Sequence, residues 1–312
     1  NHKGWEGLGA FNAEERKLAN DLLGFKAHIV FPTSAFDQVL AAKEQKIILG
    51  GVEALNKGMA TFCSVDKRMH GAAYIPFAYG EAIALKFLKQ AIKDGFSVIM
   101  IDTIAPQGSK ASTHPDFDVV WKEIEENDIA ITLHVGADNG WDPVPLSFYN
   151  NGSNVPTHKE GDAPRDALAY MGISYCAELF LASMIFDGVF NRFPNLRVGV
   201  VELGASWIIS WMKHLDQSFR AFRRLQDLSQ VELLPSEYVQ KHIKVTAFPG
   251  EDIGWLLNNG AADLMMFASD YPHHEGTDDP IKRFEQTMSD VSEQNKTKFY
   301  SENFKKLLGS HI

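Results

Sequence analysis

The chain has 312 residues, of which 45% are hydrophobic and 22% charged, and it carries a formal net charge of −10 with a pI near 5.6. This acidic balance argues against nucleic acid or an anionic membrane as a partner. No apolar stretch reaches 18 residues, and Cys63 and Cys176 lack CxxC spacing. We therefore expect a cytoplasmic globular protein without a transmembrane helix, an N-terminal signal peptide or a disulfide framework.

Apolar runs recur along the chain with helical patterns between them. In 81–95, Ala84, Leu88 and Ala91 share one face of a predicted helix, and Gly95 is placed to end it. Between the apolar runs 97–102 and 129–135, helical spacing recurs at Phe117, Val120, Trp121 and Ile124. The apolar runs predict strands at 27–32, 72–77, 97–102, 129–135, 197–202, 243–248 and 264–270.

Strands that alternate with amphipathic helices predict βαβ units and a parallel sheet. Seven such units in a single domain, 1–312, indicate a (β/α)8 barrel with one strand unaccounted for. A doubly wound open sheet is the alternative, and it is disfavoured because no GxGxxG turn follows an early strand. The stretch 137–172, rich in Gly, Asn, Pro and Asp, predicts a long functional loop after a strand end.

Three of the apolar runs end on a residue that can bind a metal or move a proton: His134, Glu202 and Asp270. The carboxyl ends of barrel strands meet at one mouth, so these side chains should converge there. A histidine and carboxylates in that position suit a divalent metal. Each also has a structural explanation: a core histidine for His134, an ion pair for Glu202 and a turn cap for Asp270.

Other polar residues are weaker candidates. Asp102 also ends an apolar run, and we expect a structural hydrogen bond for it at the barrel rim. Of His273 and His274, one should line the mouth. Arg165 could hold a substrate carboxylate, although packing is the expected role for most of the loop residues, which include Trp141, Tyr149, His158 and Arg165. Glu202 and Asp270 could instead be the two catalytic carboxylates of a glycosidase, but nothing in the sequence indicates an aromatic surface that binds a sugar.

Several segments resemble one enzyme family. They are DLLGFKAHIVFPT (21–33), DFDVVWKEIEENDIAITLHVG (116–136), RFPNLRVGVVELGASW (192–207) and FASDYPHHEG (267–276). These are similar to the amidohydrolase-related branch of the amidohydrolase superfamily, which includes aminocarboxymuconate-semialdehyde decarboxylase and related aromatic-acid decarboxylases. The resemblance implies a distorted TIM barrel. It also implies that His134 is a metal ligand and that Asp270 both binds metal and transfers a proton.

Two departures from the family pattern stand out. Glu202 occupies a position where the family usually has a histidine. The HxH pair of ligands expected on the family's first strand is absent from this sequence. Either an N-terminal segment is missing from the chain, which we favour, or the protein is a degenerate member that has lost its metal.

Three functions remain open on this basis. The first is decarboxylation of a small aromatic or unsaturated carboxylic acid with one divalent ion, Zn or Mn, and no organic cofactor. Asp270 would deliver the proton, and Glu202 would assist that transfer or orient the substrate, which Arg165 and His273 could also contact. The second is hydrolysis of a lactone, ester or amide, which an added anion at Glu202 favours. The third is a non-catalytic barrel. The only expected partners are the substrate and a second copy of the chain in a homodimer.

Overall fold

The computed structural model describes residues 7–152, 166–273 and 279–312. Its seven strands form one curled parallel sheet in which each strand pairs with the next along the chain. The strands are β1 (His28–Val30), β2 (Met69–Ile75), β3 (Val98–Ile101), β4 (Ala130–His134), β5 (Arg197–Val201), β6 (Ile243–Thr246) and β7 (Met265–Met266).

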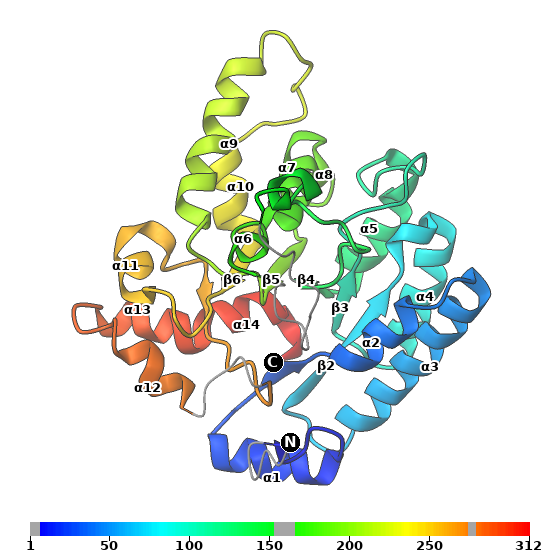
Figure 1. Cartoon of the computed structure of the whole chain (residues 1–312), viewed down its shortest axis with the longest axis vertical. Helices are drawn as coiled ribbons and strands as arrows, with labels where there is room; N and C mark the ends of the chain where they lie inside the picture. Colours follow the sequence, from blue (N-terminus) through cyan, green and yellow to red (C-terminus); the bar gives the residue numbers. More distant parts are fainter. Residues whose placement is uncertain (1–6, 153–165, 274–278) are drawn as a thin grey trace.

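Helices surround this sheet, with α2 to α5 on one side and α11 to α13 on the other (Figure 1). Among the described residues they are α1 (Ala13–Leu23), α2 (Thr33–Leu40), α3 (Gln45–Cys63), α4 (Glu81–Lys93), α5 (Asp118–Glu126), α6 (Ala167–Met171), α7 (Tyr175–Phe186), α8 (Val189–Arg192), α9 (Ile208–Phe222), α10 (Pro235–His242), α11 (Ile253–Leu256), α12 (Pro280–Glu285), α13 (Glu293–Thr297) and α14 (Asn303–Leu308).

All seven predicted strands are present, and the predicted helices 81–95 and 117–124 appear as α4 and as α5 with the turn before it. The last strand is much shorter than the predicted 264–270. The N–H of Phe267 donates to the carbonyl of Phe299 at 2.9 Å, so the chain leaves the sheet there. Asp270 therefore lies beyond the strand rather than at its last position.

The sheet has two outer edges, because β1 pairs with β2 and β7 with β6, and no strand in the described ranges joins β1 to β7. The predicted (β/α)8 architecture with one strand unaccounted for is confirmed as a curled, open barrel. The doubly wound alternative is wrong, since that fold reverses its strand order at a switch point and this order follows the chain throughout.

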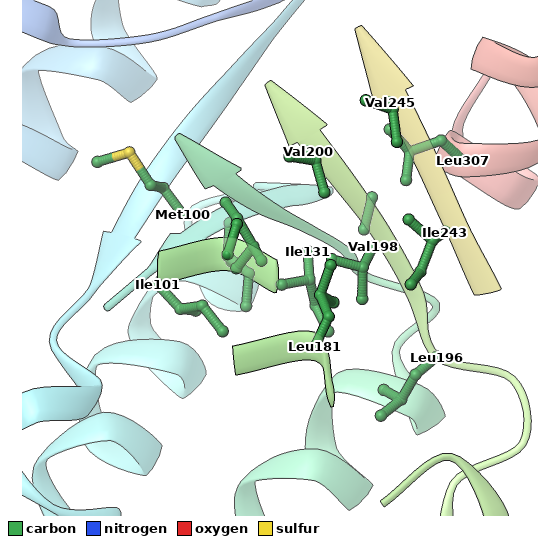
Figure 2. Close-up of a cluster of buried hydrophobic side chains, with 14 of the residues drawn as sticks. Met100, Ile101, Ile131, Leu181, Leu196, Val198, Val200, Ile243, Val245 and Leu307 are labelled. Atoms are coloured by element: carbon green, nitrogen blue, oxygen red, sulfur yellow. The ribbon is translucent and has the colours of Figure 1, made fainter. Parts of the chain in front are cut away.

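Successive side chains along each strand point to opposite faces of the sheet. One face packs against the surrounding helices, and the other lines the barrel interior. Ile131 and Val198 face outward and meet Leu181 of α7, as Figure 2 shows. On the inner side, Gly199 leaves room for Leu307 of α14, whose Cδ2 would lie 2.8 Å from an added Cβ. The C-terminal helix therefore fills the barrel interior beside β5.

The segment after β4 is only partly irregular. Residues 146–149 form a 3₁₀ helix, and α6 occupies 167–171. The residues Ala167–Phe186 are long and apolar enough to pass as a membrane span by length and composition, contrary to our expectation from the sequence. A turn at 172–174 interrupts this segment, and 44% of its apolar window is buried inside the protein.

Two glycine substitutions test the packing of the helices. A Cβ on Gly254 would lie 1.7 Å from the carbonyl oxygen of Thr287, so G254A should lower the free energy of unfolding by about 2 kcal/mol or more. Gly50 is exposed within α3 and has no atom within 4 Å of an added Cβ, so G50A should raise the free energy of unfolding by about 0.5–1 kcal/mol. Urea unfolding of both variants measures the difference, and equal effects would contradict this packing.

Candidate active site

The residues expected at the barrel mouth do meet there. His134 is the last residue of β4, Glu202 follows β5 directly, and Asp270 and His273 come from the segment after β7. Their side chains are between 6 and 24% exposed, so they are partly shielded from water. The parallel direction of the strands brings together residues that lie more than a hundred positions apart.

Glu202 lies at the centre of this group and contacts a histidine through each oxygen. Its Oε2 is 2.9 Å from Nε2 of His134, and its Oε1 is 3.7 Å from Nδ1 of His273. The same His273 nitrogen is 3.3 Å from Oδ1 of Asp270. The four side chains thus alternate imidazole and carboxylate in the order His134, Glu202, His273, Asp270.

The orientation of His134 is fixed from two other directions. Its Nδ1 lies 2.9 Å from the carbonyl oxygen of Val135, and the ring of Phe31 lies 4.4 Å from the imidazole ring. Each ring nitrogen therefore faces an oxygen that only accepts hydrogen bonds when Glu202 is ionised. These contacts hold the imidazole ring in place beside Glu202.

Burial alone would raise the pKa of Glu202, but hydrogen bonds and charges from His134 and His273 outweigh it and lower the pKa to about 2. The pKa of Glu202 therefore lies well below neutral pH, and an imidazole lies against each of its carboxylate oxygens.

Both carboxylates lie on unusual backbone. Glu202 has φ of 59° and Asp270 has φ of 53°, in the left-handed region that residues with a side chain seldom adopt. The Glu202 N–H donates to Oγ1 of Thr246 at 3.2 Å, which helps to hold the turn after β5. Strained backbone of this kind clusters at functional sites, where the surrounding structure enforces it.

A cavity of about 1310 Å³ opens beside the four side chains. It is lined by both outer strands, with Ile29 from β1 and Met266 from β7, so it extends into the gap between them. Phe31 and Phe248 contribute aromatic surface near the polar group. The site therefore combines a mainly apolar chamber with one polar wall, as small-molecule sites usually do.

The donor set fits a divalent metal. One oxygen each from Glu202 and Asp270 and one nitrogen of His273 lie within 4.8 Å of one another, and two oxygens with one imidazole nitrogen suit Mn²⁺, Zn²⁺ or Fe²⁺. His134, expected from the sequence as a ligand, is outside this set and reaches it through Glu202. His273, expected from the sequence to line the mouth or contact the substrate, belongs to this set. The short SDYPH segment is the signal that places His273 beside Asp270.

The other candidates have different outcomes. The structural hydrogen bonds expected for Asp102 are present: its carboxylate accepts from the Tyr74 hydroxyl at 2.6 Å, the Ala78 N–H at 2.9 Å and the Asn139 amide at 3.2 Å. Tyr149 is buried and donates to Asp166, which supports a packing role. The predictions for His158, Arg165 and His274 lie outside the described residues.

Comparison with known proteins identifies the family. The family model described as "Amidohydrolase" matches residues 38–310. The chain belongs to the amidohydrolase family of enzymes. Membership agrees with the open barrel and with the strand-end position of the polar group.

Several solved structures share this fold. An amidohydrolase from Mycobacterium avium subsp. paratuberculosis is 19% identical with a TM-score of 0.79, over 96% of this chain and 74% of that one. A 5-carboxyvanillate decarboxylase from Novosphingobium aromaticivorans, complexed with manganese and 4-hydroxy-3-methoxy-5-nitrobenzoic acid, is 20% identical with a TM-score of 0.72, over 95% and 80%. A 2,6-dihydroxybenzoate decarboxylase from Rhizobium is 18% identical with a TM-score of 0.71, over 94% and 87%.

The buried carboxyl group of Asp102 should make the stability of the protein depend on pH. Burial raises its pKa from 3.8 to about 6, although its hydrogen bonds oppose the shift. Between these values the folded state binds more protons than the unfolded state, so stability should fall as pH rises from about 4 to about 6. At 1.36 kcal/mol per unit, the loss is up to about 3 kcal/mol.

The variant D102N removes this titration while it keeps the volume of the side chain. Urea unfolding at pH 4, 5, 6 and 7 should show the fall in the parent protein and a flatter profile in D102N. Parallel profiles for the two proteins would show that Asp102 ionises normally in the fold.

Proposed function

We propose that the chain is a metal-dependent decarboxylase of a small aromatic acid, formed around Glu202, Asp270 and His273. The observation that carries this proposal is the alternating row of imidazoles and carboxylates at the rim of an apolar cavity. Such a row offers carboxylate oxygens and imidazole nitrogens that could hold a cation and could also move a proton. The decarboxylases of aromatic acids that share the fold support the choice of substrate class.

A bound Mn²⁺ or Zn²⁺ would supply positive charge that draws in the substrate carboxylate or a neighbouring hydroxyl. Glu202, Asp270 and His273 are the residues that would hold it. The proposal includes no organic cofactor, because the metal and the aromatic ring would stabilise the negative charge that develops as CO₂ leaves.

Side chains of the protein would carry out the proton transfer. When the bond between the ring carbon and the carboxyl carbon breaks, its electron pair stays on the ring carbon and CO₂ leaves. That carbon then takes a proton, which we assign to Asp270, with His273 at 3.3 Å to replace it. His134 balances the charge of Glu202 during this step.

The cavity supports an aromatic substrate. Phe31 and Phe248 offer flat apolar surface, and Phe31 also packs on His134. A hydroxybenzoate ring placed against these side chains would present its carboxylate to the polar wall. The low exposure of the four polar residues limits the entry of water.

Hydrolysis of a lactone, ester or amide is the second candidate. It is favoured by the family, which is described as "Amidohydrolase", and by the Asp270 carboxylate beside His273, which could accept a proton from water. The two reactions differ in their products, since one releases CO₂ and the other releases a new acid without loss of carbon.

A substrate panel separates the two candidates. Metal-loaded protein is incubated with dihydroxybenzoates and 5-carboxyvanillate labelled with ¹³C in the carboxyl group, and in parallel with aryl lactones and esters. Labelled CO₂ from the first group is the expected result, whereas acid release from the second group alone would establish hydrolysis. Turnover of neither group would favour the non-catalytic barrel.

Asp270 should be essential for turnover. The variant D270N keeps size and shape but cannot deliver the proton, so kcat should fall at least ~100-fold. The exposed surface variant E53Q is the control and should keep its rate within about twofold. An unchanged rate in D270N would remove Asp270 from the proton step.

Glu202 should be needed for metal. Elemental mass spectrometry should find about one divalent ion per chain in the parent protein, and E202Q should bind that ion at least ~10-fold more weakly. Chelation should lower the Tm of the parent, since a ligand that binds only the folded state stabilises it. Equal metal content in both proteins would exclude Glu202 as a ligand.

A further inference from the structure

A second cavity lies at the opposite end of the barrel from the proposed active site. Its volume is about 470 Å³. Arg197 is the first residue of β5, and Lys244 lies near the start of β6, so the cavity is at the amino ends of these strands. Its lining contains four side chains that carry positive charge and one carboxylate: Arg197, Lys241, Lys244, Lys306 and Asp263.

Lys244 is the buried centre of this cavity. It is only 6% exposed, and it lies two residues before Thr246, which lines the large cavity, so both side chains are on the inner face of the sheet. Its Nζ donates to the neighbouring carbonyl of Ile243 at 3.1 Å, the one hydrogen bond found for it within the described ranges. A buried ammonium normally requires a counter-charge or a full set of acceptors.

The nearby carboxylates are already engaged by other cations. Asp128 pairs with Arg197, which also donates to the carbonyl of Leu307 at 2.8 Å. Asp263 accepts from Lys298 at 2.8 Å and from Lys306 at 3.3 Å. Across the parts of the chain that the structure describes, no carboxylate forms an ion pair with Lys244.

The neighbouring histidine does not add charge to this cavity. Burial lowers the pKa of His242 to about 4, and its Nδ1 lies 2.8 Å from the carbonyl oxygen of Leu196. Burial also lowers the pKa of Lys244 to about 8, with the charge of Lys306 as a second cause. Lys244 therefore remains mainly protonated at pH 7, and the cavity keeps an excess of positive charge.

We propose that this cavity binds a tetrahedral oxyanion, either inorganic phosphate or the terminal phosphate of a monoester, with Lys244 as its buried donor. Lys306 and Lys241 complete the site from α14 and α10. An oxyanion would supply further acceptors and a direct ion pair, which Lys244 does not form among the described residues, where Asp263 acts on it only through its charge. The site is separate from the metal-binding group, because the two lie at opposite ends of β5 and β6.

Isothermal titration of the metal-loaded protein with inorganic phosphate tests this inference, with sodium chloride used to keep the ionic strength constant. We expect one saturable site per chain. In K244M the aliphatic part of the side chain is kept and the charge is removed, so Kd should rise at least tenfold. The matched control is K93M, at an exposed lysine at the end of α4, where Kd should stay within twofold.

A second variant keeps the test valid if K244M does not fold. Lys306 has a side chain that is 54% exposed, so K306M should fold, and it should weaken phosphate binding several-fold. Competition by phenyl phosphate would identify a monoester site, whereas phosphate binding without competition would identify a site for the free ion. No saturable binding, or equal Kd in the parent, K244M and K306M, would overturn the proposal. None of these results depends on turnover, so they are independent of the proposed decarboxylation.

Discussion

The parallel direction of the strands is the constraint on which the rest of this structure depends. Because each strand pairs with its successor in the chain, all carboxyl ends lie on one rim and all amino ends on the other. One rim then gathers His134, Glu202 and Asp270 from three distant segments. The other gathers lysines and an arginine. A protein with a net charge of −10 thereby keeps a local excess of positive charge at one end of its sheet.

Glu202 links the elements of the proposed active site. Its two oxygens reach His134 on one side and His273 on the other, so removal of its charge would change both histidines together. The resemblance to the family implies a histidine at this position, and the structure places the Glu202 carboxylate between two histidines instead.

The sequence predicted the sheet well because buried parallel strands are continuous apolar runs, which are easily recognised in a sequence. It also predicted which residues meet at the mouth, since three of these runs end on polar residues. It did not predict that β7 would be two residues long, because the decisive contact is the carbonyl of Phe299, far along the chain. It could not place His273 close enough to Glu202 to share a metal ion, and it did not indicate that Lys244 would have no ion pair among the described residues. Both depend on distances that only the folded chain defines.

The left-handed backbone at Glu202 and Asp270 limits how this site can be redesigned or can diverge. Glycine and asparagine adopt such backbone readily, so a change at Asp270 to asparagine disturbs chemistry more than shape. Valine, isoleucine or threonine at either position would disturb the turn itself. Libraries that vary these two positions should therefore be small and weighted toward short polar residues. More varied substitutions belong at the apolar residues that line the cavity, where the side chains would determine which substrate fits.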